Sequence, residues 1–231
     1  MSDAHELKAK LRFGFVEMLF ALTAAEIAIQ FADLVLKVPR ILSSAPAYTH
    51  LVLALSLVAT SWVGWSKSEA LGNIKDVESV FSWEFLVLLL DVLLVILYFI
   101  IVKGVDSEKT PDGHITIVPS AENETLWIMV VFAVYLIWDF LTKFVISEQK
   151  TVRARLSEFW NRGWVSVVCL LLAIFGWYTL RAVQGPRNVV LADVSLLSLV
   201  FLFRALKEKK GWGWGFLLVV AFVAPLIVAT V

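Results

Sequence analysis

Charge is scarce in this sequence, and it is balanced. Only 17% of the 231 residues are charged, whereas a typical soluble domain has about 25%. Lys and Arg together number 20, as do Asp and Glu, so the formal net charge is zero. A protein without a basic field has no long-range attraction for phosphate backbones, and we therefore expect no nucleic-acid partner.

Residues that carry catalysis or hold metals are equally few. The single cysteine, Cys169, excludes an intrachain disulfide, and the three histidines (His5, His50 and His114) lie outside the bodies of the expected helices. No HExxH, Walker loop, GxSxG or Cys-x-x-Cys motif is present, and the last apolar stretch has no lysine for retinal. We therefore expect no metal, no cofactor and no enzymatic activity. A TVGYG filter and an arginine ladder are also absent, which argues against a potassium-channel pore and a voltage sensor.

Hydrophobic residues, by contrast, make up 60% of the chain and occur in long blocks. A helix needs about 20 apolar residues to cross a bilayer, and seven stretches reach or approach that length. They are residues 13–36, 48–66, 80–102, 126–146, 164–180, 189–206 and 213–231. We predict an all-α polytopic transmembrane helical bundle of about seven spans, in a single membrane-embedded domain at 1–231. Six spans are the alternative, if one short stretch is re-entrant.

The distribution of Lys and Arg predicts the orientation of these spans. Fourteen of the 20 fall in the N-terminal segment and the second, fourth and sixth loops, and six fall on the other side. Because basic residues are retained in the cytoplasm, this asymmetry places the N-terminus there and the C-terminus outside. We expect the protein in a cell membrane, either the plasma membrane or a bacterial inner membrane, surrounded by lipid and assembled as a homo-oligomer.

Two loops have distinct compositions. Residues 104–125 carry five acidic residues and form a short extracytoplasmic loop, in which the turn at 111–113 followed by HITIV predicts a small hairpin. Residues 147–163 are basic and amphipathic, and they predict either a short helix in the inner membrane interface or an ordinary anchoring loop. Three arginines in this second loop are candidates for binding anionic lipid or a cytoplasmic protein. They are Arg153, Arg155 and Arg162.

Ionisable and polar side chains within the spans are the most informative positions, because a charge at bilayer depth costs about 2.5–3.5 kcal/mol. In the first span they recur every three or four residues, and in the third every seven, so in each span they share one helical face. The candidates for an ion pathway or a buried polar network are Glu26, Gln30, Asp33, Asp91, Tyr98, Asp139, Lys143 and Asp193.

Depth and spacing assign roles to four of these residues. Glu26 and Asp91 lie near the middle of their spans with no basic residue three or four positions away, so we expect their carboxylates to face each other. Two carboxylates that share a proton would form a proton relay or a cation site. Alternatively, the two acids only hold neighbouring helices together by hydrogen bonds. Asp139 is expected to pair with Lys143, four residues later on the same helix.

Two functional classes follow. The first is a channel or transporter that moves protons or small cations past Glu26 and Asp91, with Asp33 and Asp193 at the outer mouth. The second is a non-conducting sensor or partner subunit that docks a cytoplasmic protein through the basic loop at 147–163. An Asp91→Asn variant separates the classes, because it should change flux in the first and mainly stability or assembly in the second.

Overall fold

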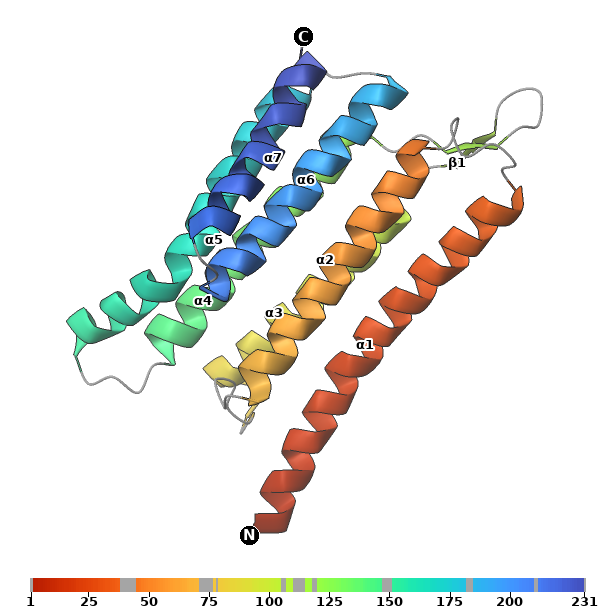
Figure 1. The fold of residues 1–231 in the computed structure, drawn as a ribbon. Helices are drawn as coiled ribbons and strands as arrows, with labels where there is room; N and C mark the ends of the chain where they lie inside the picture. Colours follow the sequence, from red (N-terminus) through yellow and green to blue (C-terminus); the bar gives the residue numbers. More distant parts are fainter. Residues whose placement is uncertain are drawn as a thin grey trace.

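The computed structural model (Figure 1) describes residues 2–37, 45–70, 77, 79–104, 107–109, 115–117, 120–146, 151–181, 185–209 and 212–230. Seven α-helices lie within this part of the chain. They are α1 (Ser2–Lys37), α2 (Ala45–Ala70), α3 (Trp83–Lys103), α4 (Ala121–Phe140), α5 (Val152–Leu180), α6 (Pro186–Lys207) and α7 (Trp212–Thr230). A turn of π-helix, η2 (Leu141–Val145), continues α4.

Six of these helices are long and apolar enough to cross a membrane. The seventh, α7, is also apolar, but the stretch suited to lipid, Gly213–Ala229, is shorter. The N- and C-termini lie at opposite ends of the bundle (Figure 1). The chain is thus a membrane-embedded all-α helical bundle, which confirms the predicted fold class.

Local sequence signals set where the helices begin. Ser82, Ser120 and Thr151 precede α3, α4 and α5, and each side-chain oxygen accepts a hydrogen bond from the backbone N–H three residues later. These N-caps satisfy N–H groups of the first turn that have no partner within the helix. Before α6, Gly185 adopts a φ of 100°, which glycine tolerates without strain, and Pro186 follows at the first helical position.

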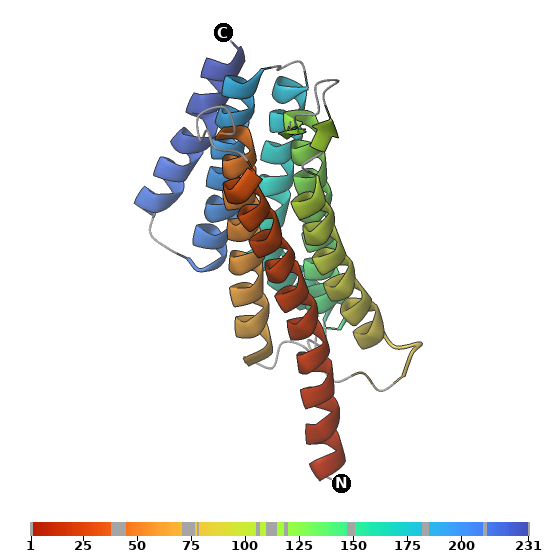
Figure 2. The same cartoon turned by 90° about the vertical axis from the view of Figure 1, so that its right-hand side faces the viewer.

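Four helices enclose the interior of the bundle. α2 packs against α3, α3 against α4, α4 against α6, and α6 against α2, so the four form a closed ring. α5 covers α4, α7 covers α6, and α1 lies across α2 and α3 at the opposite edge (Figures 1 and 2). A polar side chain that points into this ring is shielded from lipid, so these four helices position the candidate site.

The predicted outer loop at 104–125 contains two short strands. β1 (Ser107–Lys109) and β2 (Ile115–Ile117) pair antiparallel with Ser107 opposite Ile117, as the predicted hairpin requires. α4 begins at Ala121, so the last residues of the predicted loop are helical. Glu124 therefore belongs to the first turns of a membrane helix rather than to a loop.

The predicted basic loop at 147–163 is also mostly helical. Residues 152–163 form the first turns of α5, which is continuous over 29 residues, and 147–150 lie outside the described residues. No proline interrupts 152–180, so the amphipathic segment and the apolar span share one hydrogen-bonded helix.

Candidate functional site

Polar side chains inside the ring occur at two levels, and three helices contribute to both. Eleven residues separate His50 from Ser61 on α2, Glu124 from Tyr135 on α4, and Asp193 from Arg204 on α6. Eleven residues correspond to three helical turns, or about 16 Å along the axis. We call His50, Glu124 and Asp193 the outer layer, and Ser61, Tyr135 and Arg204 the inner layer. The inner layer lies toward the end of the bundle that the Lys and Arg distribution places in the cytoplasm.

The outer layer is a buried cluster of three ionisable groups. His50, Glu124 and Asp193 are 0%, 3% and 1% exposed. The Nδ1 atom of His50 lies 2.5 Å from Oε1 of Glu124, and the hydroxyl of Thr49 donates a hydrogen bond to Asp193. The His50 ring also faces the carbonyl groups at the end of α3, at Ile101 and Val102.

Among the described residues, three buried polar atoms of the outer layer have no hydrogen-bond partner when both acids are taken as ionised. Nε2 of His50, Oε2 of Glu124 and Oδ1 of Asp193 are buried without a hydrogen-bond partner in the described part of the chain. The Glu124 and Asp193 carboxyl groups nevertheless lie within hydrogen-bonding reach of each other, and a proton on one of them would join the two. Within the described residues, no group of three or more His, Cys, Asp and Glu is arranged to hold a metal ion. The chemistry that fits these side chains is the exchange of protons.

An apolar layer separates the two polar levels. It is made of residues on α2, α4 and α6 that are at most 2% exposed. They are Leu53, Leu57, Ile128, Val131, Leu196 and Leu199. These side chains belong to one packed core, so within the described part of the chain they separate the outer layer from the inner layer, although Ser195 and Ser198 of α6 are buried at the same height.

The inner layer opens into a cavity of about 620 Å³. Hydroxyl groups from three helices form a chain along it: Ser61 Oγ lies 2.6 Å from Tyr135 Oη, which lies 2.6 Å from Tyr98 Oη. Beside this chain, Asp91 Oδ1 accepts a hydrogen bond of 2.9 Å from the indole N–H of Trp138. Asp91 and Tyr98 are both buried, so they point to the same side of α3, as their spacing predicted.

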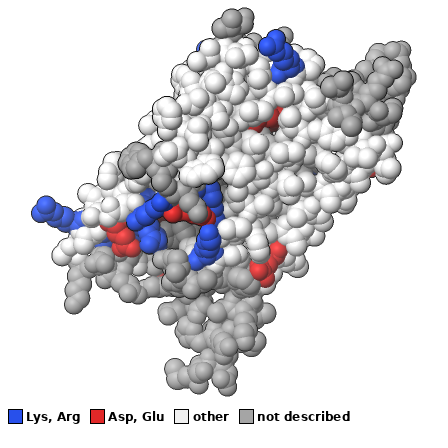
Figure 3. Space-filling view, viewed as in Figure 1, with Lys and Arg blue, Asp and Glu red and all other residues white. Residues whose placement is uncertain are grey.

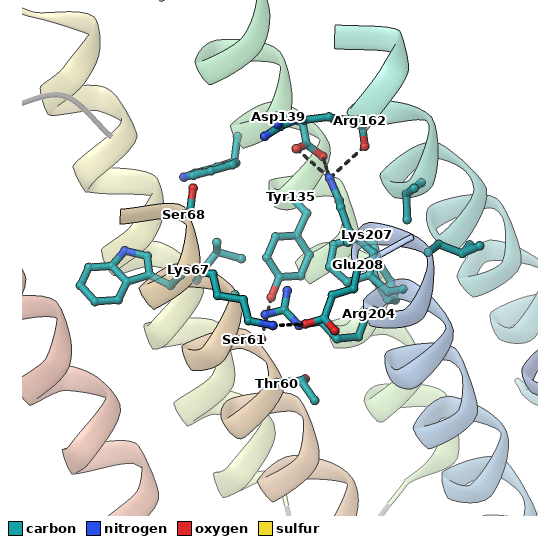
Figure 4. Close-up of a pocket in the computed structure, with 18 of the residues that line it drawn as sticks. Thr60, Ser61, Lys67, Ser68, Tyr135, Asp139, Arg162, Arg204, Lys207 and Glu208 are labelled. Carbon is teal, nitrogen blue, oxygen red and sulfur yellow. Dashed lines mark hydrogen bonds and ion pairs between the residues drawn. The ribbon is translucent and has the colours of Figure 1, made fainter. Parts of the chain in front are cut away.

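Asp139 forms its close ion pair with a different lysine from the one predicted. Lys207 of α6 donates to its two carboxylate oxygens at 2.8 and 2.6 Å and to the carbonyl oxygen of Arg162 at 3.0 Å, while the Ser166 hydroxyl also donates to Asp139 (Figure 4). The predicted partner, Lys143, lies in η2, where hydrogen bonds run over five residues. Lys143 still interacts electrostatically with Asp139, but it is Lys207 of α6 that contacts both carboxylate oxygens directly.

Arg204 occupies the side of the cavity opposite Asp139 (Figure 4). Its side chain is 18% exposed, and its Nε lies 3.8 Å from Oε1 of Glu208, the same oxygen that accepts from Lys67 at 2.6 Å. Both Nε and Nη2 of Arg204 are buried without a hydrogen-bond partner among the described residues. The guanidinium lies against Gly64, where an added Cβ would approach its nitrogen atoms to 2.2 Å.

The expected meeting of Glu26 and Asp91 does not occur. Glu26 pairs with Lys103, the last residue of α3, and accepts a hydrogen bond of 3.2 Å from Gln30. Asp91 lies twelve residues before Lys103, or about 18 Å along α3. Spacing within a helix identifies the shared face of its polar residues but not their height relative to another helix, which is why the prediction was wrong. Asp33, predicted at the outer mouth, is exposed.

The three arginines predicted to bind lipid or protein lie at the start of α5. Arg153 and Arg162 are exposed and Arg155 is half-buried. Arg162 also lines the inner cavity, which the sequence did not predict.

Sequence reasoning missed most of the outer layer. It included Asp193 but placed Glu124 in a loop and His50 outside the helix bodies. A usable signal was present, because the eleven-residue spacing between polar residues recurs in three spans. Arg204 and Lys207 were passed over because each lies near a helix end, where a basic side chain usually reaches the membrane surface.

Compared with protein-family models, curated proteins and solved structures, the chain shows no significant match to any of them.

Proposed function

We propose that this protein is an integral membrane channel or transporter that moves protons, with the outer layer as its proton-exchanging site. The observation that carries the proposal is the stacking of His50, Glu124 and Asp193 three turns from an open inner cavity on the same three helices. Chains of Asp, Glu and His inside a membrane bundle are the usual components of proton relays. The apolar layer between the two levels then acts as the gate.

The charge of the cavity favours protons over metal cations as the transported species. Among the described lining residues, six are basic and three are acidic. A sodium or potassium ion entering from the inner end would meet an excess of like charge, which raises the barrier to its passage. A proton can instead pass between hydroxyl, imidazole and carboxyl groups without a free cation occupying the cavity.

Proton movement requires the apolar layer to open. α2, α4 and α6 carry both polar layers and the apolar layer, so a small shift of these helices against one another would join the two levels. Motion of packed helices by about 1–2 Å is a common form of gating, and hydrophobic constrictions are known to close pores by excluding water.

The proposal is tested by proton flux into liposomes that contain the purified protein and a pH-sensitive dye. Wild-type protein is expected to dissipate an imposed pH gradient, and Glu124→Gln is expected to reduce the rate to that of protein-free liposomes. Glu122→Gln is the matched control, because Glu122 lies on the same helix but is exposed. Wild-type liposomes that hold their gradient, or equal rates in the two variants, would overturn the proposal.

A second candidate function is a sensor or partner subunit that docks a cytoplasmic protein at the start of α5. α5 spans about 43 Å, which exceeds the roughly 30 Å of the hydrocarbon core, so its first turns extend beyond the membrane. Val152, Leu156 and Trp160 on these turns are 70%, 54% and 60% exposed. If this surface is the functional one, Arg153→Gln with Arg155→Gln should abolish recovery of a partner in a pull-down while leaving proton flux unchanged.

A further inference from the structure

Basic side chains dominate the wall of the inner cavity. Among the described residues, six Lys and Arg line it, against three acidic residues. The basic residues are Lys67, Lys143, Arg162, Arg204, Lys207 and Lys209. Basic and acidic atoms also gather toward the lower part of the surface shown in Figure 3, whereas the middle of that face is largely uncharged. The cavity therefore lies at the charged end of the bundle, and the apolar middle of the bundle is suited to contact with lipid.

The three acidic residues of the wall already have partners within it. Both oxygens of Asp139 accept from Lys207, and Asp91 accepts from Trp138. Glu208 is shared by Lys67 and Arg204, since one of its oxygens lies 2.6 Å from the first and 3.8 Å from the second. The Glu208 carboxylate is thus shared by two cations, and its contact with Arg204 is the longer of the two.

Arg204 has the geometry of a site for an oxyanion. A guanidinium presents several N–H groups in one plane, and Nε and Nη2 of Arg204 are buried with no hydrogen-bond partner in the described part of the chain. Figure 4 shows the guanidinium beside Ser61 and Tyr135. These hydroxyls are bonded to each other and to Tyr98, so one proton of the three is left to donate to a ligand. Gly64 allows the guanidinium to lie directly against α2, because a side chain there would displace it.

The wall next to Arg204 is aromatic. The rings of Tyr135 and Phe203 are stacked with centroids 4.8 Å apart, and Phe132 meets Phe203 edge-on at 5.3 Å. All three residues line the cavity. A volume of about 620 Å³ lies within the roughly 300–1,000 Å³ usual for small-molecule sites, so the space accepts an organic body as well as a charged head.

We propose that the inner cavity binds an organic oxyanion. Its carboxylate, phosphate or sulfonate head is held by Arg204 and by one hydroxyl of the Ser61–Tyr135 pair, and its apolar body lies against Phe132 and Phe203. The inference deepens the proposed function, since it names the chemical class of the solute that occupies the inner side of the proton pathway.

Calorimetric titration of the purified protein in an uncharged detergent tests this site directly. The probe is benzenesulfonate, which combines a strong-acid oxyanion with one aromatic ring. We expect saturable binding of benzenesulfonate, at least tenfold weaker binding of inorganic sulfate, and no binding of benzylamine, which presents the same ring with a positive charge. Equal binding of benzylamine, or no binding of benzenesulfonate, would overturn the proposal.

Variants of the site separate recognition by Arg204 from general charge attraction. Arg204→Gln is expected to weaken benzenesulfonate binding at least tenfold, whereas Arg187→Gln, at the exposed outer end of the same helix, should leave it unchanged. Gly64→Ala provides a second route if Arg204→Gln does not fold, because alanine favours the helix but displaces the guanidinium. Unchanged affinity in Gly64→Ala and Arg204→Gln would contradict the assigned site.

The source of the anion is resolved by competition with oleate. Displacement of benzenesulfonate by oleate would identify a membrane-derived anion, and its absence would identify a water-soluble one; both outcomes keep the oxyanion chemistry. Because binding is measured without a gradient, failure of this test leaves the proton flux of the outer layer to be judged separately in liposomes.

Discussion

Buried acidic side chains in this bundle find their partners on other helices. Lys207 of α6 reaches Asp139 of α4, and Trp138 of α4 donates to Asp91 of α3. Contacts of this kind join helices side by side and leave few carboxylate oxygens uncompensated within the bundle. The outer layer differs, because there two carboxyl groups, those of Glu124 and Asp193, face each other and can be joined only by a proton.

A double-mutant cycle tests which lysine stabilises Asp139. Asp139→Asn combined with Lys207→Met should give a coupling energy of about 2 kcal/mol, since the two charges are in direct contact and largely buried. The same cycle with Lys143→Met should give a clearly smaller value. Chemical unfolding in detergent micelles is the measurement, and a larger coupling for Lys143 would restore the pairing predicted from the sequence.

At this scale, the sequence predicted which side chains are buried better than it predicted what they contact. The seven-residue spacing correctly placed Asp91 and Tyr98 on one buried face. Lys143 does interact electrostatically with Asp139, as the spacing predicted, but the direct ion pair of Asp139 is with Lys207, 68 residues later on another helix. Partners on other helices could not be predicted, because their relative height depends on packing and on loop lengths.

Three helices, α2, α4 and α6, supply most of the candidate site. Each contributes one residue to the outer layer, one to the inner layer and two to the apolar layer between them. α1 and α5 begin 11 and 12 residues before the predicted spans, whereas the other five predicted spans agree with the helices to within about five residues. The agreement is good where a long apolar block fills the helix, because such blocks are the strongest signal in a membrane sequence. The segment at 147–163 was predicted as a separate unit because it is charged, whereas the apolar span that follows it is not. Composition alone does not show that 152–163 and the apolar span form one helix, α5.

The role of the apolar layer is tested by comparing two truncations of Leu199 that leave similar space. Leu199→Ser should increase proton flux, because a polar side chain allows water into the gap, whereas Leu199→Ala should increase it much less, because apolar cavities remain dry. Both variants should be destabilised by about 2–5 kcal/mol. Similar flux in the two variants would show that the layer does not act as a barrier to protons.

Across the whole molecule, charged side chains lie mainly at the ends of the bundle, and apolar surface covers its middle. The fourteen-to-six distribution of Lys and Arg predicts a cytoplasmic N-terminus, and the inner cavity lies at that same end. The orientation decides whether the organic anion reaches the inner cavity from the cytoplasm.

Single cysteines introduced in a Cys169→Ser background test this orientation. Glu122→Cys, at the exposed outer end of α4, should react with a membrane-impermeant maleimide in intact cells. Arg153→Cys, at the exposed start of α5, should react only after the membrane is permeabilised. Labelling in the reverse order would invert the topology, and labelling of both in intact cells would contradict the arrangement of α4 and α5.

Proton transport through the outer layer is tested most directly by measuring the ion selectivity of the protein in liposomes, without any organic anion present. A potassium gradient with valinomycin sets the membrane voltage, and the voltage at which net proton movement stops is measured at several pH gradients. If protons pass through the outer layer, this null voltage should shift by about 59 mV for each unit of pH difference. A sodium gradient should not change it. A null voltage that follows the sodium gradient instead of pH would contradict the account.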